Sequence, residues 1–363
     1  MKNTIITNTK RQLLMLCAAL CCAVMWGANP TAPDMSAVNE TSYQLTVNSG
    51  ANGVTSVTYF VDSTDEIPET GDTRQYSVIE GVEVSFTFTP SSEYSVGSVT
   101  VDGVDVTASL QPGMTSPTVK TYTLAPMSAD VTVQVTYAKN YTDGEVFTAQ
   151  TIEGVNMDFK VISAADMTCQ VGDGSHSSIA DGVTVVTVPS VVNGFTVTTV
   201  GSNAFWRGAF GALTTVTLPS TITSIGNNAF ESCGALTAIV IPEAETTISD
   251  NAFLQCYDLA SVTMPPTITY IGESAFKSTP SLTSIELPTS ITTISAQAFY
   301  SSGLTSITIP EGVTSIGESA FNSCSSLATV NFPTSLLTIG KGAFSLNSAL
   351  TAINLPSPLQ TIG

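Results

Sequence analysis

Histidine is almost absent from this sequence of 363 residues, in which His176 is the only one. Metal sites built from several histidines are therefore excluded, and a Ser-His-Asp or Cys-His catalytic arrangement would depend on that single side chain. His176 lies in a run of Gly, Asp and Ser at 172–178, a composition typical of a solvated loop. We predict that it is not catalytic.

Acidic side chains are common but form no recognisable site. Asp166, Asp173 and Asp181 lack the alternating spacing of a calcium loop. Glu243 and Glu245 could serve a glycosidase only inside a cleft, which their surroundings in a repeat turn do not predict. We predict no catalytic residue, no metal and no cofactor, with a secreted hydrolase as the alternative that such a cleft would support.

Basic residues are also scarce, and three of the ten lie in the first eleven positions, at Lys2, Lys10 and Arg11. An uncharged apolar run at 13–26 follows, which predicts a secretory signal peptide over residues 1–28. The run is shorter than the roughly 20 residues that cross a bilayer. We therefore predict a secreted or cell-surface protein with no integral membrane association after signal cleavage.

The signal leaves open an uncleaved anchor, the cleavage position within 23–28, and lipidation at Cys17, Cys21 or Cys22. Beyond it, seven basic residues face 29 acidic ones, so the net charge is 7 − 29 = −22. Such a surface repels nucleic acid. We predict no nucleic-acid partner.

Four cysteines follow the signal, and no C-x-x-C pair is present, which excludes structural zinc. Cys233, Cys256 and Cys324 share one position of a repeat, so we interpret them as small core residues. A disulfide between Cys233 and Cys256, one repeat apart, is the alternative.

Strand-like alternation begins after a Pro-containing linker at 29–41 and predicts a small all-β domain at 42–138. Its apolar-alternating segments are 43–47, 54–61, 82–88, 99–101 and 131–137. The first and last segments, with the Val-Asp-Gly turn at 101–103, resemble divergent internalin-type B-repeat modules. That resemblance implies a spacer or adhesive stalk, and an unrelated β-sandwich is the alternative.

The second half of the chain is repetitive. The dipeptide Ala-Phe recurs with its phenylalanine at Phe205, Phe230, Phe253, Phe276, Phe299, Phe321 and Phe344. The intervals of 22 to 25 residues predict a solenoid of about 23-residue coils over 183–363, with about eight repeats and the last incomplete. Residues 144–182 are expected to cap its first coil. The predicted fold is therefore mainly β, a small all-β domain followed by a repeat solenoid.

One repeat reads Leu-x-x-Ile-x-Ile-Pro, then Val-x-x-Ile-Gly, then Ala-Phe and Cys, as at 304–324. The alternating apolar residues predict a short strand, which the proline ends because it cannot continue the hydrogen-bond ladder. This unit resembles that of BspA-like leucine-rich-repeat surface proteins over 145–363. The resemblance implies exported proteins that attach cells to matrix proteins, host cells or other bacteria. We interpret Ala244 and Glu245 as one extra residue in a turn.

Two sets of side chains could bind a ligand. A candidate ligand face on the outward side of the strands comprises Thr217, Val240, Thr263, Glu286, Thr308, Asn331 and Asn354. Candidate anchors in the loops are Trp206, Arg207, Tyr257, Tyr270 and Tyr300.

We predict an adhesin-like binding protein whose array engages a protein or glycan ligand on host or bacterial surfaces. The alternative is a structural spacer or self-assembling surface component without a specific ligand, associating through the uncapped C-terminal coil.

Overall fold

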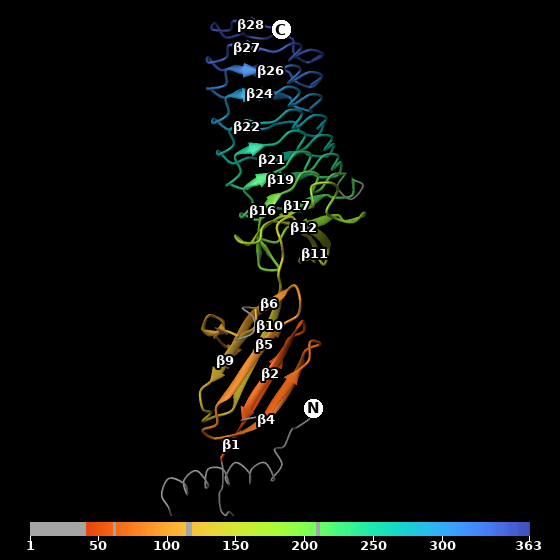
Figure 1. The fold of residues 1–363 in the computed structure, drawn as a ribbon. Coiled ribbons are helices and arrows are strands. Elements are labelled where there is room, and N and C mark those ends of the chain that lie inside the picture. Colours follow the sequence, from red (N-terminus) through yellow and green to blue (C-terminus); the bar gives the residue numbers. More distant parts are fainter. Residues whose placement is uncertain (1–40, 61–62, 114–117, 208–210) are drawn as a thin grey trace, which may run out of the picture. The chain divides into compact units, whose positions relative to one another are not determined.

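The computed structural model describes residues 41–60, 63–113, 118–207 and 211–363. The predicted signal peptide and the predicted linker up to residue 40 lie outside the described residues. Two compact units divide between Asn140 and Tyr141. Strands form nearly every element of both units (Figure 1), which confirms the mainly β fold.

The first unit contains two five-stranded sheets. One has the order β4 (Asp72–Ile79), β1 (Ser42–Ser49), β10 (Val131–Lys139), β6 (Tyr94–Val101) and β7 (Val104–Asp105). The other has the order β3 (Ser63–Ile67), β2 (Gly53–Phe60), β5 (Val84–Pro90), β9 (Lys120–Leu124) and β8 (Gln111–Pro112). A short 3-10 helix, η2 (Thr107–Ser109), follows β7. The first and last long strands, β1 and β10, pair in parallel.

Alternating residues bury one side of the longer strands in both sheets, as in Leu45 and Val47 of β1. One buried cluster in this core is polar. The hydroxyl of Thr55 lies 2.8 Å from that of Ser49 and 2.8 Å from that of Tyr137, whose hydroxyl also donates to the Val54 carbonyl at 3.0 Å. Each hydroxyl in the cluster therefore has a partner, which offsets the cost of its burial.

The second unit opens with a sheet that leads into the repeats. Its order is β11 (Val146–Gln150), β12 (Asn156–Ser163), β13 (Thr168–Val171), β16 (Phe195–Val200) and β15 (Val191–Val192). Phe147, Met157 and Phe159 bury their side chains in the same core cluster as the repeats.

Most coils of the array contribute two short strands. The first strand ladder consists of β14 (Val185–Thr187), β17 (Thr215–Thr217), β19 (Ala238–Val240) and β21 (Ser261–Thr263), and after an interruption β24 (Ser306–Thr308) and β26 (Thr329–Asn331). The strands end just before an apolar residue and the predicted proline.

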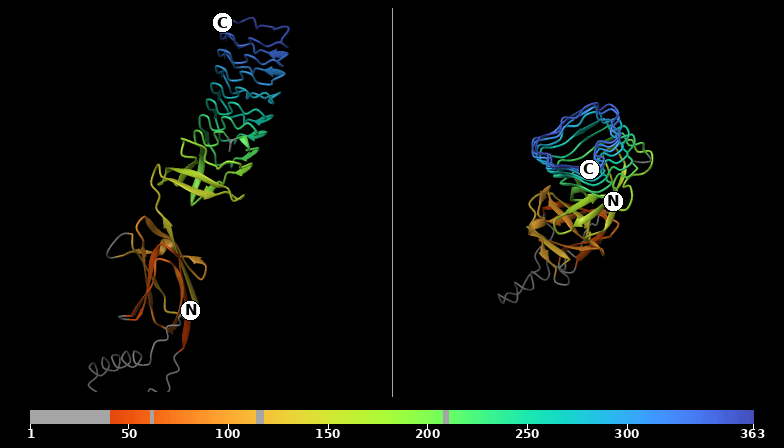
Figure 2. Two further views of the ribbon diagram at one scale, coloured as in Figure 1. Left: turned by 90° about the vertical axis from the view of Figure 1, so that its right-hand side faces the viewer. Right: turned by 90° about the horizontal axis from the view of Figure 1, so that it is seen from above.

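The second strand ladder lies on another side of the coil. It consists of β16, β18 (Ser224–Ile225), β20 (Thr247–Ile248), β22 (Tyr270–Ile271), β23 (Thr293–Ile294), β25 (Ser315–Ile316), β27 (Thr338–Ile339) and β28 (Thr361–Ile362). Viewed along the array, the coils follow one another in nearly the same outline (Figure 2).

The Ala-Phe segments form a third side, which we call the Ala-Phe ladder. Successive rings from Phe205 to Phe344 stack with centroids 5.0 to 5.5 Å apart and interplanar angles of 4 to 9°. At every junction three amides donate to the next coil, as Asn251 does to Glu273, Phe253 to Ala275 and Gln255 to Lys277.

The residues two before and two after each phenylalanine make this pairing because they adopt positive φ, as Asn251 (56°) and Gln255 (60°) do. Such residues turn their amides toward the next coil, at a strain cost of roughly 1 to 2 kcal/mol for a residue with a Cβ. The gain in paired backbone groups therefore outweighs that strain in every coil.

Candidate binding surfaces of the repeat array

The outward side of the first strand ladder exposes mostly polar side chains. All seven side chains of the candidate ligand face are exposed, but only five lie on strands, because the structure has no strand at Glu286 or Asn354. Glu286 carries the one charge among the seven, and Val240, which is 65% exposed, is their one large apolar group. Aromatic residues and arginine carry most of the binding energy in protein interfaces. This face offers neither.

The candidate anchors do not form one surface. Trp206, Arg207 and Tyr300 lie on the Ala-Phe ladder, and Tyr257 follows Cys256, beyond the ladder. Tyr270 belongs to strand β22, so its prediction as a loop residue was wrong. It stands on the outward side of the second strand ladder, because the next residue, Ile271, is the buried one.

Two cations stack on the aromatic anchors. The Arg207 guanidinium lies 4.5 Å from the centre of the Trp206 ring, and the Lys277 ammonium 5.0 Å from that of Tyr300. Lys277 also donates to the side-chain oxygen of Gln297 at 2.6 Å. The sequence reasoning missed Lys277, although it shares its repeat position, directly after phenylalanine, with Trp206 and Tyr300.

These repeats match a known family. The family model described as BspA type leucine rich repeat region matches six copies, over residues 185–303 and 272–363. Residues 185–363 are a BspA-type leucine-rich-repeat region. The resemblance of residues 42–138 to B-repeat modules stays a prediction.

Solved bacterial structures also resemble the chain. A leucine-rich repeat protein from Bacteroides ovatus is 30% identical over 61% of this chain and 49% of its own, with a TM-score of 0.41. A leucine rich repeat protein from T. pallidum is 26% identical over 58% of this chain and 91% of its own, with a TM-score of 0.46. This chain thus spans about half the length of the B. ovatus protein. None of the curated proteins compared with the chain matches it.

The cysteine column of the BspA-type array satisfies backbone groups. Each thiol donates to the phenylalanine carbonyl of the preceding coil, Cys233 to Phe205 at 3.0 Å, Cys256 to Phe230 at 3.1 Å and Cys324 to Phe299 at 3.1 Å. Where threonine replaces cysteine, the Thr279 hydroxyl donates instead to the phenylalanine carbonyl of its own coil, Phe276, at 2.8 Å. Cysteine and threonine at this position therefore each satisfy a phenylalanine carbonyl.

The same thiols are reduced, so the alternative disulfide between Cys233 and Cys256 is not formed among the described residues. Burial raises the pKa of Cys256 and of Cys324. A thiol that is buried and protonated reacts slowly with oxidants. Its role in the array is structural.

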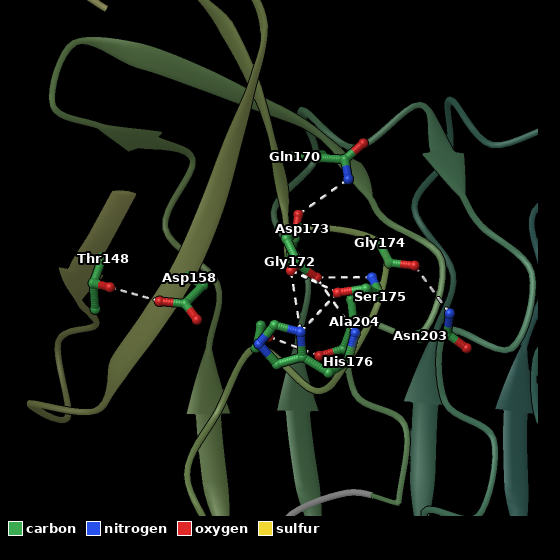
Figure 3. A network of polar contacts seen from close by, with 11 residues as sticks. Thr148, Asp158, Gln170, Gly172, Asp173, Gly174, Ser175, His176, Asn203 and Ala204 are labelled. Carbon is green, nitrogen blue, oxygen red and sulfur yellow. Dashed lines mark hydrogen bonds and ion pairs between the residues drawn. The ribbon is translucent and has the colours of Figure 1, made fainter. Parts of the chain in front are cut away.

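The loop that contains His176 places a serine, a histidine and an aspartate together (Figure 3). The Ser175 hydroxyl and an Asp173 carboxylate oxygen both approach Nδ1 of His176, at 2.8 and 3.0 Å. A catalytic triad requires serine and aspartate on opposite ring nitrogens. Because the ring is also 61% exposed, this arrangement is a local turn contact and does not form a triad.

Asp173 instead organises the turn, accepting the Ser175 amide and hydroxyl at 2.7 Å each. Burial raises the pKa of Asp173, but these bonds and that from the His176 amide outweigh it and hold the pKa below its usual value. After the turn, the amide and hydroxyl of Ser178 both donate to Ala204 at 2.7 Å. Ser178 thereby caps the Ala-Phe ladder, since its amide bonds Ala204 as the Phe205 amide bonds Ala229.

Glu243 and Glu245 do not form a carboxylate pair in a cleft. Glu243 is exposed, whereas Glu245 is 1% exposed. The predicted extra residue at 244–245 was wrong, because the spacing from Pro242 to Ile248 equals that from Pro219 to Ile225. Glu245 occupies the buried column of Ile222 and Ile268, and its amide donates to Pro242 as theirs do to Pro219 and Pro265.

The carboxylate of Glu245 is only partly satisfied. Oε1 accepts the amides of Thr246 and Thr247 at 3.0 Å each, and the buried Oε2 has no hydrogen-bond partner. Burial raises the pKa of Glu245, although the amides of Thr247 and Thr246 oppose the shift. An alignment of the repeats on their prolines would have shown from the sequence alone that Glu245 falls at the repeat position of the buried aliphatic residues.

Within the described part of the chain, His, Cys, Asp and Glu side chains form no group of three that could hold a metal ion. The same described residues include no helix with the length and apolar character to cross a membrane.

Proposed function

We propose that the protein is an exported, adhesin-like binding protein whose BspA-type array engages a protein or glycan on host or bacterial surfaces. Stacked repeats present extended surfaces that bind macromolecules, and the only serine, histidine and aspartate contact described above lacks catalytic geometry. Export rests on the signal predicted at 1–28.

The two aromatic and cation pairs of the Ala-Phe ladder support this proposal. Trp206, Arg207 and Tyr300 are of the side-chain types that dominate protein interfaces, and Lys277 lies over the Tyr300 ring. Each cation is already ordered on its ring, so less side-chain freedom is lost when a ligand binds. The Ala-Phe ladder, and not the strand face, is therefore the proposed contact surface.

Purified residues 29–363 can be tested for saturable binding to immobilised matrix proteins, mucin and whole cells. We expect a variant carrying W206A, R207A, K277A and Y300A to bind at least about tenfold more weakly. The matched control, T217A with T263A and T308A on the strand face, should change affinity by less than about twofold.

If none of the probes shows saturable binding, the adhesin proposal is wrong. Loss of affinity in the strand-face variant alone would move the site to that face. If no probe binds, the alternative function as a spacer or self-assembling component remains. A monomer in light scattering over a wide concentration range would count against self-assembly.

A further inference from the structure

The second strand ladder is interrupted at one junction, between coil 213–235 and coil 236–258. Strand β18 of the first coil pairs with β16, and β20 of the second pairs with β22. Although β18 and β20 are neighbours in space, no pairing joins these two described strands. Every later strand of this ladder, from β20 to β28, pairs with the next.

Glu245 accounts for part of this interruption. In most coils, the residue that follows the buried aliphatic position donates its amide to the preceding coil. Thr223 donates in this way to Thr198 and Thr269 to Thr246, both at 2.8 Å. The Thr246 amide instead donates to the carboxylate of Glu245 at 3.0 Å. The carboxylate also accepts the Thr247 amide, so two donors, one in β20 and one directly before it, are bonded within the coil.

Ser249 accounts for the remaining loss of pairing between β18 and β20. The equivalent position is glycine in most coils, and the Gly272 amide donates to Ile248 of the preceding coil at 2.7 Å. A Cβ at Gly272 would lie 2.6 Å from the Asp250 amide nitrogen, so coils with a side chain here cannot approach as closely. At Ser249 the hydroxyl, not the amide, donates to Ile225, at 2.6 Å.

The first strand ladder does not compensate at this junction. Strands β17 and β19 are paired only at Thr215 and Ala238, whereas β19 and β21 are paired over their full length. The Ala-Phe ladder is complete there, because the amides of Asn228, Phe230 and Ser232 all donate to the next coil.

The junction between coils 259–281 and 282–303 distinguishes the effect of the serine from that of Glu245. Ser295 also replaces the glycine and bonds Ile271 through its hydroxyl at 2.6 Å, but its coil has Ile291 in the buried column instead of glutamate. There one strand pair survives, Ile271 with Ile294. Serine alone thus loosens the second ladder, whereas serine with Glu245 accompanies its complete interruption.

We propose that Glu245 and Ser249 make the junction between coils 213–235 and 236–258 a hinge, at which the second strand ladder opens, the first keeps a single pair and the Ala-Phe ladder stays closed. The array then consists of two cooperative parts, the capped first coils and the coils from 236 onward. Repeat arrays open locally at their weakest neighbour interface.

Hydrogen exchange of the full chain, followed by mass spectrometry at neutral pH, tests the hinge. Amides at 243–249 should exchange at least about tenfold faster than those at 266–272, with 289–295 in between. The variant E245I with S249G should slow exchange at 243–249 to the rate at 266–272. E243Q, which changes an exposed glutamate in the same turn, should leave all three rates unchanged.

Equal exchange at 243–249 and 266–272 in the unaltered chain would overturn the proposal, and this comparison needs no variant. Unchanged exchange at 243–249 in a folded E245I, S249G variant would also overturn it. S249G alone, which should slow exchange only in part, provides the test if the double variant fails to fold.

Discussion

The Ala-Phe ladder and the strand ladders of the array differ in their continuity. The Ala-Phe ladder repeats the same ring contact and the same three amide bonds at every junction from Phe205 to Phe344. The first strand ladder is interrupted at 284–286 and the second at Glu245. One continuous side is enough to hold the stack, so the other sides can accept residues that break their pairing.

The difference has a chemical origin. The Ala-Phe pair recurs in every coil up to Phe344, and stacked rings need no particular donor or acceptor. Strand pairing depends on close approach of backbones, which one side chain in the glycine column prevents, and on free amides, which one carboxylate can take. The five predictions below test this comparison, from the largest expected effect to the smallest.

Removal of one ring should damage the stack most. Phe253 is fully buried and lies 5.3 Å, centre to centre, from both Phe230 and Phe276. We expect F253A to lower the free energy of unfolding by about 3 to 5 kcal/mol in urea titrations. I239A, a buried residue on the strand side of the same coil, should cost less. An equal or larger cost for I239A would contradict the comparison.

Replacement of the buried carboxylate should stabilise the array. E245I places the residue typical of the column at 245 and removes a buried oxygen without a partner, so the free energy of unfolding should rise by about 1 to 3 kcal/mol at pH 7. The exposed E243Q should change it by less than about 0.5 kcal/mol.

This stabilisation should depend on pH. The pKa of Glu245 is raised in the folded state, so its charged form opposes folding at every pH above that raised value. As pH falls toward the ordinary glutamate range the folded protein takes up the proton first, and the penalty disappears. The difference in Tm between E245I and the unaltered chain should therefore shrink from pH 7 to pH 4. A difference that grows on acidification would contradict the assignment of charge to Glu245.

A smaller gain should follow from relief of backbone strain on the Ala-Phe ladder. Leu346 adopts a φ of 61° and is 76% exposed, so its side chain contributes little packing. L346G should raise the free energy of unfolding by about 0.5 to 1 kcal/mol, and L346N by less, because asparagine tolerates this conformation. Destabilisation by both changes would show that the leucine side chain contributes packing that its exposure does not indicate.

The smallest effect is expected on the candidate ligand face. The Thr308 hydroxyl accepts a bond from Asn331 at 3.0 Å, and both residues are exposed. T308A should change the free energy of unfolding by less than about 0.5 kcal/mol. A larger loss would mean that the strand side depends on such surface bonds, which would narrow its difference from the Ala-Phe ladder.

Sequence periodicity predicted the array well because each coil contacts only its neighbours. The Ala-Phe interval, the buried columns and the strands that end before proline all follow from one repeated unit. In the first unit the sequence predicted strands but not their partners, since β1 pairs with β10, at the other end of the domain. Pairing between distant segments leaves no local pattern in a sequence.

The sequence by itself determined the period, the residues that fill the columns, and the lack of histidine and basic side chains. Only the tertiary structure showed that Tyr270 stands on a strand, that Ser178 caps the Ala-Phe ladder, and that Glu245 is buried with one oxygen unpaired. The physical reason is that a repeat specifies which positions face inward. Which amide bonds which oxygen between two coils depends on their separation, and that separation is fixed only when the side chains of both are packed.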